Sequence, residues 1–208
     1  MHIYAFGSVC RGEIDHGSDI DMLACIKGGE PPIDAKQFSI YTYDKLQELW
    51  RVGNPFVWHL HFESKLVFSC DGSDFLSGLG VPAKYQEIEF DLAKFRELFD
   101  GAVAALLAGA ENSIFNLSCV FLAVRNAAMC YSIYCGKAEF SRYSALNVEP
   151  VLPVSRNVYE ILVRARLLSS RGYGSLISKQ EVAAVVEVID VIRLWMDRLE
   201  ENTNETRI

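Results

Sequence analysis

Residues 3–26 read I-Y-A-F-G-S-V-C-R-G-E-I-D-H-G-S-D-I-D-M-L-A-C-I, and this stretch decides the fold. A short apolar run ends at Gly7-Ser8, a polar loop follows, and Asp19 and Asp21 open a second apolar run. Glycine lets backbone N–H groups come close to a phosphate. Side chains alternate along a strand, so the two aspartates are predicted on one face. Mg²⁺ prefers such oxygen ligands together with substrate phosphates. The stretch therefore predicts a phosphate-holding turn followed by a metal-holding strand.

The combination G-S-x-x-R-G and S-D-I-D across residues 7–21 resembles the signature of the DNA polymerase β-like nucleotidyltransferase superfamily. It is closest in style to the small bacterial branch that includes kanamycin nucleotidyltransferase and the minimal nucleotidyltransferases of toxin–antitoxin pairs. The resemblance implies that Asp19 and Asp21 are catalytic and hold Mg²⁺, with two ions expected. It also implies a nucleoside triphosphate, ATP in the first instance, as the donor substrate.

The same resemblance implies a nucleotide-binding set of four residues. Gly7 and Ser8 are expected to contact the β- and γ-phosphates. Arg11 is expected either to support the loop or to contact a phosphate. Ser18 is expected to brace the turn beside the aspartates rather than to react, because no Ser–His–Asp arrangement is legible in the sequence.

Residues 56–62 alternate in polarity and are predicted as a strand, with Val57, His59, His61 and Glu63 on one face. The superfamily usually places a third carboxylate on a strand beside the aspartate pair. Glu63 is the only carboxylate on this predicted face, so it is the candidate third catalytic carboxylate. His59 and His61 are alternatives as third metal ligand or acceptor-side groups. A solvated face of a half-covered sheet would explain the same pattern.

The composition limits the classes of protein that remain. Half of the 208 residues are hydrophobic, which excludes global disorder. The net charge of −7 argues against a nucleic-acid substrate, which favours a basic surface. The six cysteines lack C-x-x-C spacing, so they predict reduced thiols rather than a zinc site. No signal peptide is recognisable and polar residues interrupt the apolar segment 114–135, so we expect a cytoplasmic protein without a membrane span.

The order of the predicted elements indicates an α+β protein. Strands are expected at about residues 2–6, 20–26, 38–43 and 56–62, with residues 66–68 extending the sheet. Helical patterns dominate from residue 87 onwards, with long helices at about 87–110, 114–135, 155–170 and 179–201. Residues 80–83 look like a linker. We therefore expect a nucleotidyltransferase-like α/β domain at 1–82 and a helical bundle domain at 83–208.

The leading prediction is a metal-dependent nucleotidyltransferase that moves a nucleoside monophosphate to an acceptor hydroxyl and releases pyrophosphate. The expected partners are the nucleotide and a small-molecule acceptor, with no nucleic acid and no membrane, and a homodimer is left open. One alternative is an antitoxin-like enzyme that acts on a protein or RNA. The other is a catalytically degenerate nucleotide-binding module, which the unclear third carboxylate motivates.

Overall fold

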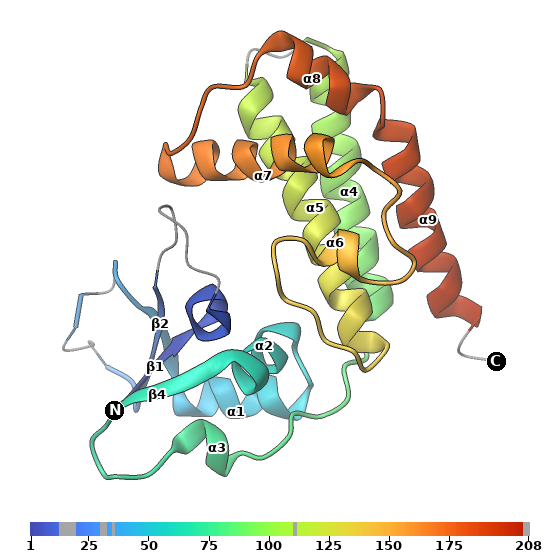
Figure 1. Ribbon diagram of the computed structural model, residues 1–208. Helices are drawn as coiled ribbons and strands as arrows, with labels where there is room; N and C mark the ends of the chain where they lie inside the picture. Colours follow the sequence, from blue (N-terminus) through green and yellow to red (C-terminus); the bar gives the residue numbers. More distant parts are fainter. Residues whose placement is uncertain (13–19, 30–32, 35, 110–111, 206–208) are drawn as a thin grey trace. The chain divides into compact units, whose positions relative to one another are not determined.

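The computed structural model describes residues 1–12, 20–29, 33–34, 36–109 and 112–205 (Figure 1). The chain divides into two compact units, Met1–Gln86 and Glu87–Ile208. The first unit carries a four-stranded sheet and the second is helical. The predicted α+β class is therefore confirmed.

The sheet of the first unit is mixed and has the strand order β3-β2-β1-β4. β1 (His2–Phe6) lies between β2 (Asp21–Ile26) and β4 (Ser64–Ser69) and runs antiparallel to both. β3 (Ser39–Thr42) pairs in parallel with β2. Three of these strands lie where the sequence predicts them, and the fourth contains the predicted extension at residues 66–68.

The strand register gathers three chain segments at one end of the sheet. Phe6, the last residue of β1, lies opposite Asp21 on one side and Ser64 on the other. Residues directly opposite each other in an antiparallel pair share a face. Asp21 therefore belongs to the face on which Phe6 and Tyr4 enter the core.

Three helices complete the core of the first unit, and one of them replaces a predicted strand. α1 (Tyr43–Arg51) follows its N-cap residue Thr42, whose side chain accepts from the Lys45 N–H at 3.1 Å. α2 (Pro55–Glu63) takes the place of the strand predicted at 56–62. α3 (Phe75–Gly78) is a single short turn. The core beneath β1 and β2 is filled from these helices by buried side chains: Leu46, Trp50, Val57, Leu60 and Leu76.

The prediction of a strand where the structure has α2 failed for a clear physical reason. The Asn54 side chain accepts from the Phe56 N–H at 2.9 Å, and Pro55 occupies the first turn, where a missing N–H costs nothing. Asn54-Pro55 therefore starts a helix in the place of the predicted strand. The apolar residues of the segment are spread around the helix rather than gathered on one face, so their alternation in the sequence did not exclude a helix. Val57 and Leu60, three residues apart, are both fully buried.

The second unit consists of α4 (Ile88–Leu107), α5 (Ser113–Tyr134), α6 (Ser144–Asn147), α7 (Arg156–Arg171), α8 (Lys179–Val186) and α9 (Ile189–Glu205). α5 is its central helix and packs against α4, α6, α7 and α9. Ser178 and Glu181 form a capping box at the start of α8. The helix that it opens ends at Val186, so the single helix predicted for 179–201 is two helices.

α5 is also the one helix of the described residues that is long and apolar enough to cross a membrane. Just over half of its most apolar window, 56%, is buried inside the protein. Burial against four neighbouring helices accounts for this composition, because a core helix is apolar nearly all round.

Candidate active site

The end of β1 leads directly into the turn predicted to hold phosphate. η1, a 3-10 helix, spans Gly7–Arg11. Gly7 and Gly12 have φ values of 80° and 76°, a left-handed conformation that favours glycine. The Gly12 N–H donates to the Val9 carbonyl at 3.1 Å and closes the turn. The two motif glycines are therefore explained by backbone conformation at both ends of η1.

Asp21 lies against this turn. A Cβ atom built on Gly7 would stand 2.9 Å from Oδ2 of Asp21, closer than real Cβ contacts come. Glycine at position 7 thus makes room for the carboxylate as well as for the backbone turn. The structure thus brings together Gly7 and Asp21, which are 14 residues apart in the sequence.

Asp21 also opens onto a surface depression of about 570 Å³. The parallel pairing of β2 with β3 places the segment before β3 beside it, and Lys36, Gln37 and Ser39 line the same depression. Sequence reasoning missed Lys36 and Gln37. No local motif marks them, because only the β2–β3 pairing brings them to this position.

Two predicted site residues, Ser18 and Asp19, lie outside the described residues. The same-face placement of Asp19 and Asp21 therefore stays a prediction. Ser8 lies in η1, half-buried, beside Gly7.

Glu63 is held by two partners at the end of α2. Its Oε2 forms an ion pair with Nη1 of Arg11, the last residue of η1. The same oxygen lies 2.8 Å from Nε2 of His59, one helical turn earlier. The side chains are mostly buried, with exposed fractions of 21% for Arg11, 12% for Glu63 and 16% for His59. We call these three residues the Arg11 cluster.

The Arg11 cluster also affects the neighbouring thiol. Cys10 Sγ lies 3.4 Å from the Ala5 carbonyl, to which it donates. Burial raises the pKa of the Cys10 thiol, Lys65 opposes this, and the Glu63 carboxylate raises it further. Cys10 is therefore a protonated structural thiol rather than a nucleophile.

Residues 2–94 match the family model of the nucleotidyltransferase domain. The match covers the sheet, η1 and the Arg11 cluster, and it supports a relation to the polymerase β-like superfamily and a nucleotidyl transfer function. No curated protein matches the chain.

The resemblance to the superfamily implies a third carboxylate on a strand beside the aspartate pair. β3, the other strand beside β2, reads Ser-Ile-Tyr-Thr and offers none. Within the part of the chain that the structure describes, no three His, Cys, Asp or Glu side chains are grouped to hold a metal ion. Asp21, with Asp19 two residues before it, still fits Mg²⁺, which commonly takes one or two carboxylates and completes its shell with phosphates and water.

His61 lies apart from the Arg11 cluster, so the predicted common face of His59, His61 and Glu63 is wrong. Consecutive odd positions share a face on a strand but point in different directions on a helix. The His61 ring contacts Trp50 and Trp58 edge-on, with centroids 6.1 and 5.9 Å apart. It lines a separate cavity of about 290 Å³ together with Asp74.

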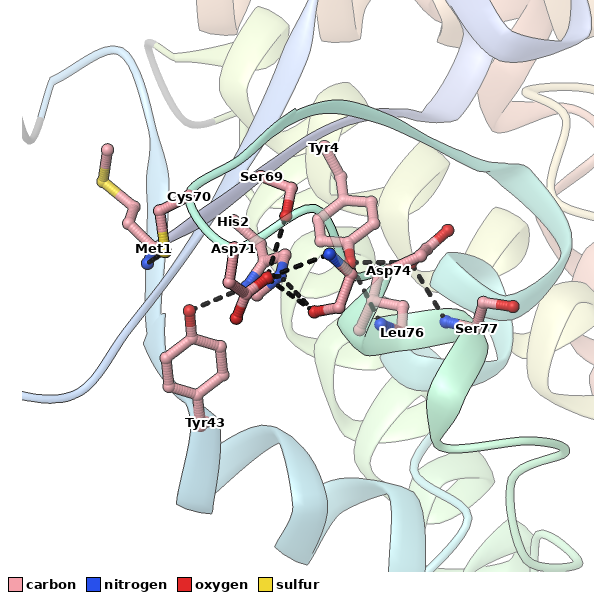
Figure 2. Close-up of polar contacts among 11 residues, drawn as sticks. Met1, His2, Tyr4, Tyr43, Ser69, Cys70, Asp71, Asp74, Leu76 and Ser77 are labelled. Atoms are coloured by element: carbon pink, nitrogen blue, oxygen red, sulfur yellow. Dashed lines mark hydrogen bonds and ion pairs between the residues drawn. The ribbon is translucent and has the colours of Figure 1, made fainter.

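A second polar cluster, missed by sequence reasoning, lies at the start of β1 (Figure 2). The buried His2 ring lies 2.8 Å from the Tyr43 hydroxyl through Nδ1. Its Nε2 lies 3.1 Å from Ser73 Oγ and 3.3 Å from Asp71 Oδ1. Hydrogen bonds from the Ser73 side chain and N–H, and then from Ser69, hold the pKa of the Asp71 carboxyl well below its usual range. We call these five residues the His2 cluster.

Proposed function

We propose that this chain is a metal-dependent nucleotidyltransferase that transfers a nucleoside monophosphate, AMP from ATP in the first instance, to an acceptor hydroxyl. The nucleotidyltransferase-domain match supports the reaction class. One observation supports this site: the Asp21 carboxylate lies against Gly7. The carboxylate that we propose to bind metal and the turn that we propose to bind phosphate are therefore neighbours. The acceptor hydroxyl gives up its proton to water and its oxygen bonds to the α-phosphorus. The bond from the α-phosphorus to the α–β bridging oxygen breaks, and pyrophosphate leaves with that oxygen.

The residues of the chain supply position and charge. The backbone of Gly7 and Ser8 would hold the β- and γ-phosphates, and Asp19 and Asp21 would hold Mg²⁺. When bound, Mg²⁺ lowers the pKa of the acceptor hydroxyl and neutralises charge on the departing pyrophosphate. Catalysis of this kind depends mainly on alignment and electrostatic stabilisation, which the Gly7 turn and the neighbouring carboxylates would supply.

The depression beside Asp21 supports a small-molecule substrate. Its volume of about 570 Å³ lies within the usual range of ligand pockets. Lys36 adds a cation to its lining, which suits a phosphate or another anionic group. The acidic balance of the chain disfavours a nucleic-acid acceptor. A small acceptor, as in the kanamycin-type branch, fits these features best.

The test is the double variant Asp19→Ala/Asp21→Ala, assayed with labelled ATP, Mg²⁺ and a panel of hydroxyl-bearing small molecules that includes aminoglycosides. We expect nucleotidyl transfer by the unmodified protein and its loss in the variant. Glu48→Gln serves as the control, because it removes an exposed carboxylate that pairs with Lys45 on α1. Equal ATP consumption by the double variant and the control would overturn the metal-site assignment.

The second candidate is a nucleotide-binding module without catalysis. It is favoured by the engagement of Glu63 with Arg11 and His59 and by the absence of a carboxylate on β3. Calorimetry with ATP and Mg²⁺ separates the two. Binding without pyrophosphate release across the acceptor panel favours the module, and binding with release favours the enzyme.

A further inference from the structure

We infer that Glu63 and His59 are positioning residues that hold Arg11 in place for a nucleotide phosphate, and that Glu63 is not the third metal ligand. This inference rests on the proposed function, because it assigns roles within the same site. It reassigns two residues that the sequence placed among the candidate metal ligands.

The first support is the way in which Arg11 is anchored. η1 has no side-chain hydrogen bond at its N-cap, so no capping side chain holds the start of the turn. Its last residue, Arg11, instead reaches Glu63 at the end of α2. Glu63 directly precedes Ser64, which pairs with Phe6, and Phe6 directly precedes the turn. The ion pair therefore joins the end of the turn to the strand that leads out of α2.

The second support is the position of His59. An ionised carboxylate only accepts hydrogen bonds, so Nε2 of His59 must be the donor in its 2.8 Å contact with Glu63. The His59 ring also meets the Phe6 ring edge-on, with centroids 5.7 Å apart. Packing on one side and hydrogen bonding on the other fix His59, which in turn fixes the Glu63 oxygen that receives Arg11.

The third support is the distance between Arg11 and the phosphate-holding end of its turn. A 3-10 helix rises about 2 Å per residue, so the Arg11 backbone lies roughly 8 Å along the axis from that of Gly7. An arginine side chain covers this span. A guanidinium carries five donors in a rigid fork and can bond two anions at once. Fixing such a group before the nucleotide arrives reduces the ordering that binding requires.

The same contacts argue against Glu63 as a metal ligand. Its Oε2 already accepts from two donors, Arg11 and His59. Releasing Glu63 to a metal would leave the Arg11 guanidinium, which is four-fifths buried, without this carboxylate. Arg11 and Glu63 therefore act as one unit.

The experiment is a double-mutant cycle with Arg11→Gln, Glu63→Gln and the combined variant, measured as Mg–ATP affinity by calorimetry on the full chain. Loss of one charge-assisted hydrogen bond predicts about tenfold weaker binding for Arg11→Gln. Glu63→Gln should weaken binding by several-fold, and the combined variant should bind no worse than Arg11→Gln alone. Independent losses that multiply in the combined variant would overturn the inference.

Two further readouts separate positioning from other roles. A metal ligand would change the Mg²⁺ concentration needed for binding, whereas Glu63→Gln should leave it unchanged; an increased requirement overturns the inference. His59→Gln, which keeps a donor, should retain more affinity than His59→Phe, and equal losses also count against it. Failure of the unmodified protein to bind Mg–ATP contradicts the proposed function itself, whereas normal binding with a multiplicative cycle contradicts only this inference.

Discussion

A histidine lies beside a carboxylate at each end of β1, but the two clusters differ in what surrounds them. At the start, His2 is buried between Tyr43, Ser73 and Asp71, and its ring nitrogens are taken up by these neighbours (Figure 2). At the end, His59 and Glu63 hold Arg11 beside the Gly7 turn. The first cluster fastens a strand to the segment 69–73, whereas the second fastens a turn next to a carboxylate that opens onto a depression.

The comparison shows that a histidine–carboxylate pair is not evidence of a functional site by itself. What distinguishes the second cluster is the turn that it holds, because Asp21 lies against Gly7 of that turn and lines a depression. Substitutions at the first end should therefore affect stability, and those at the second end should affect nucleotide handling.

Gly7→Ala should give the largest loss of activity. An unchanged activity would mean that the Gly7 end of β1 is not the functional end. The new Cβ meets Asp21 Oδ2, and the residue keeps an unfavourable φ. Displacing a catalytic group by about 1 Å can cost about a hundredfold, so we expect at least that loss in kcat/KM. Gly12→Ala is the matched control, because its φ is similar but its Cβ would meet nothing within 4 Å. Similar activity losses in the two variants would contradict the account.

His2→Ala should act on stability instead. It removes a buried ring with partners on both nitrogens, so we expect a loss of about 2–3 kcal/mol in the free energy of unfolding. Urea denaturation measures this loss, and kcat/KM per folded molecule should stay within about twofold of the unmodified value. His59→Ala is the comparison at the other end. There the loss in kcat/KM, converted to a free energy, should exceed the loss in the free energy of unfolding. A reversal of this order would mean that the roles of the clusters are exchanged.

Asp71→Asn should produce the smallest effect, visible in the pH dependence of unfolding. The folded-state pKa of Asp71 lies below the usual value of 3.8, so its ionised form favours the folded state. The contribution is complete above the unfolded pKa and is lost as pH falls below about 4 towards the folded pKa. The variant should be less stable than the unmodified protein at pH 7, and the difference should shrink below pH 4. A difference that is constant from pH 7 to pH 3 would argue against this role for Asp71.

The parts of this structure that follow from short-range patterns could be predicted from the sequence. Gly7 and Gly12 mark a turn, the apolar run after Asp21 marks a strand, and the Ser178–Glu181 box starts a helix. α5 could be recognised because its apolar residues continue all round the helix. Each of these signals is contained in one segment.

The parts that depend on pairing between distant segments could not be predicted. Phe6 meets both Asp21 and Ser64 only through the sheet register, and Lys36 reaches the depression only through the β2–β3 pairing. Over residues 56–62 the apolar residues fit a strand and a helix equally well, and the Asn54 cap decided the outcome. Because the segment is helical, His61 points away from His59. His59 and Glu63, which were predicted as metal ligands, instead contact Arg11.

The central claim is that the end of β1 at Gly7 and Asp21 is a nucleotide site. The most direct measurement is calorimetric titration of the full chain with Mg²⁺ and a non-hydrolysable ATP analogue, comparing the unmodified protein with Asp21→Asn. We expect saturable binding that weakens by about tenfold or more in the variant, since a carboxylate–metal contact is lost. Equal affinity in the two proteins, or no binding by the unmodified protein, would contradict the claim.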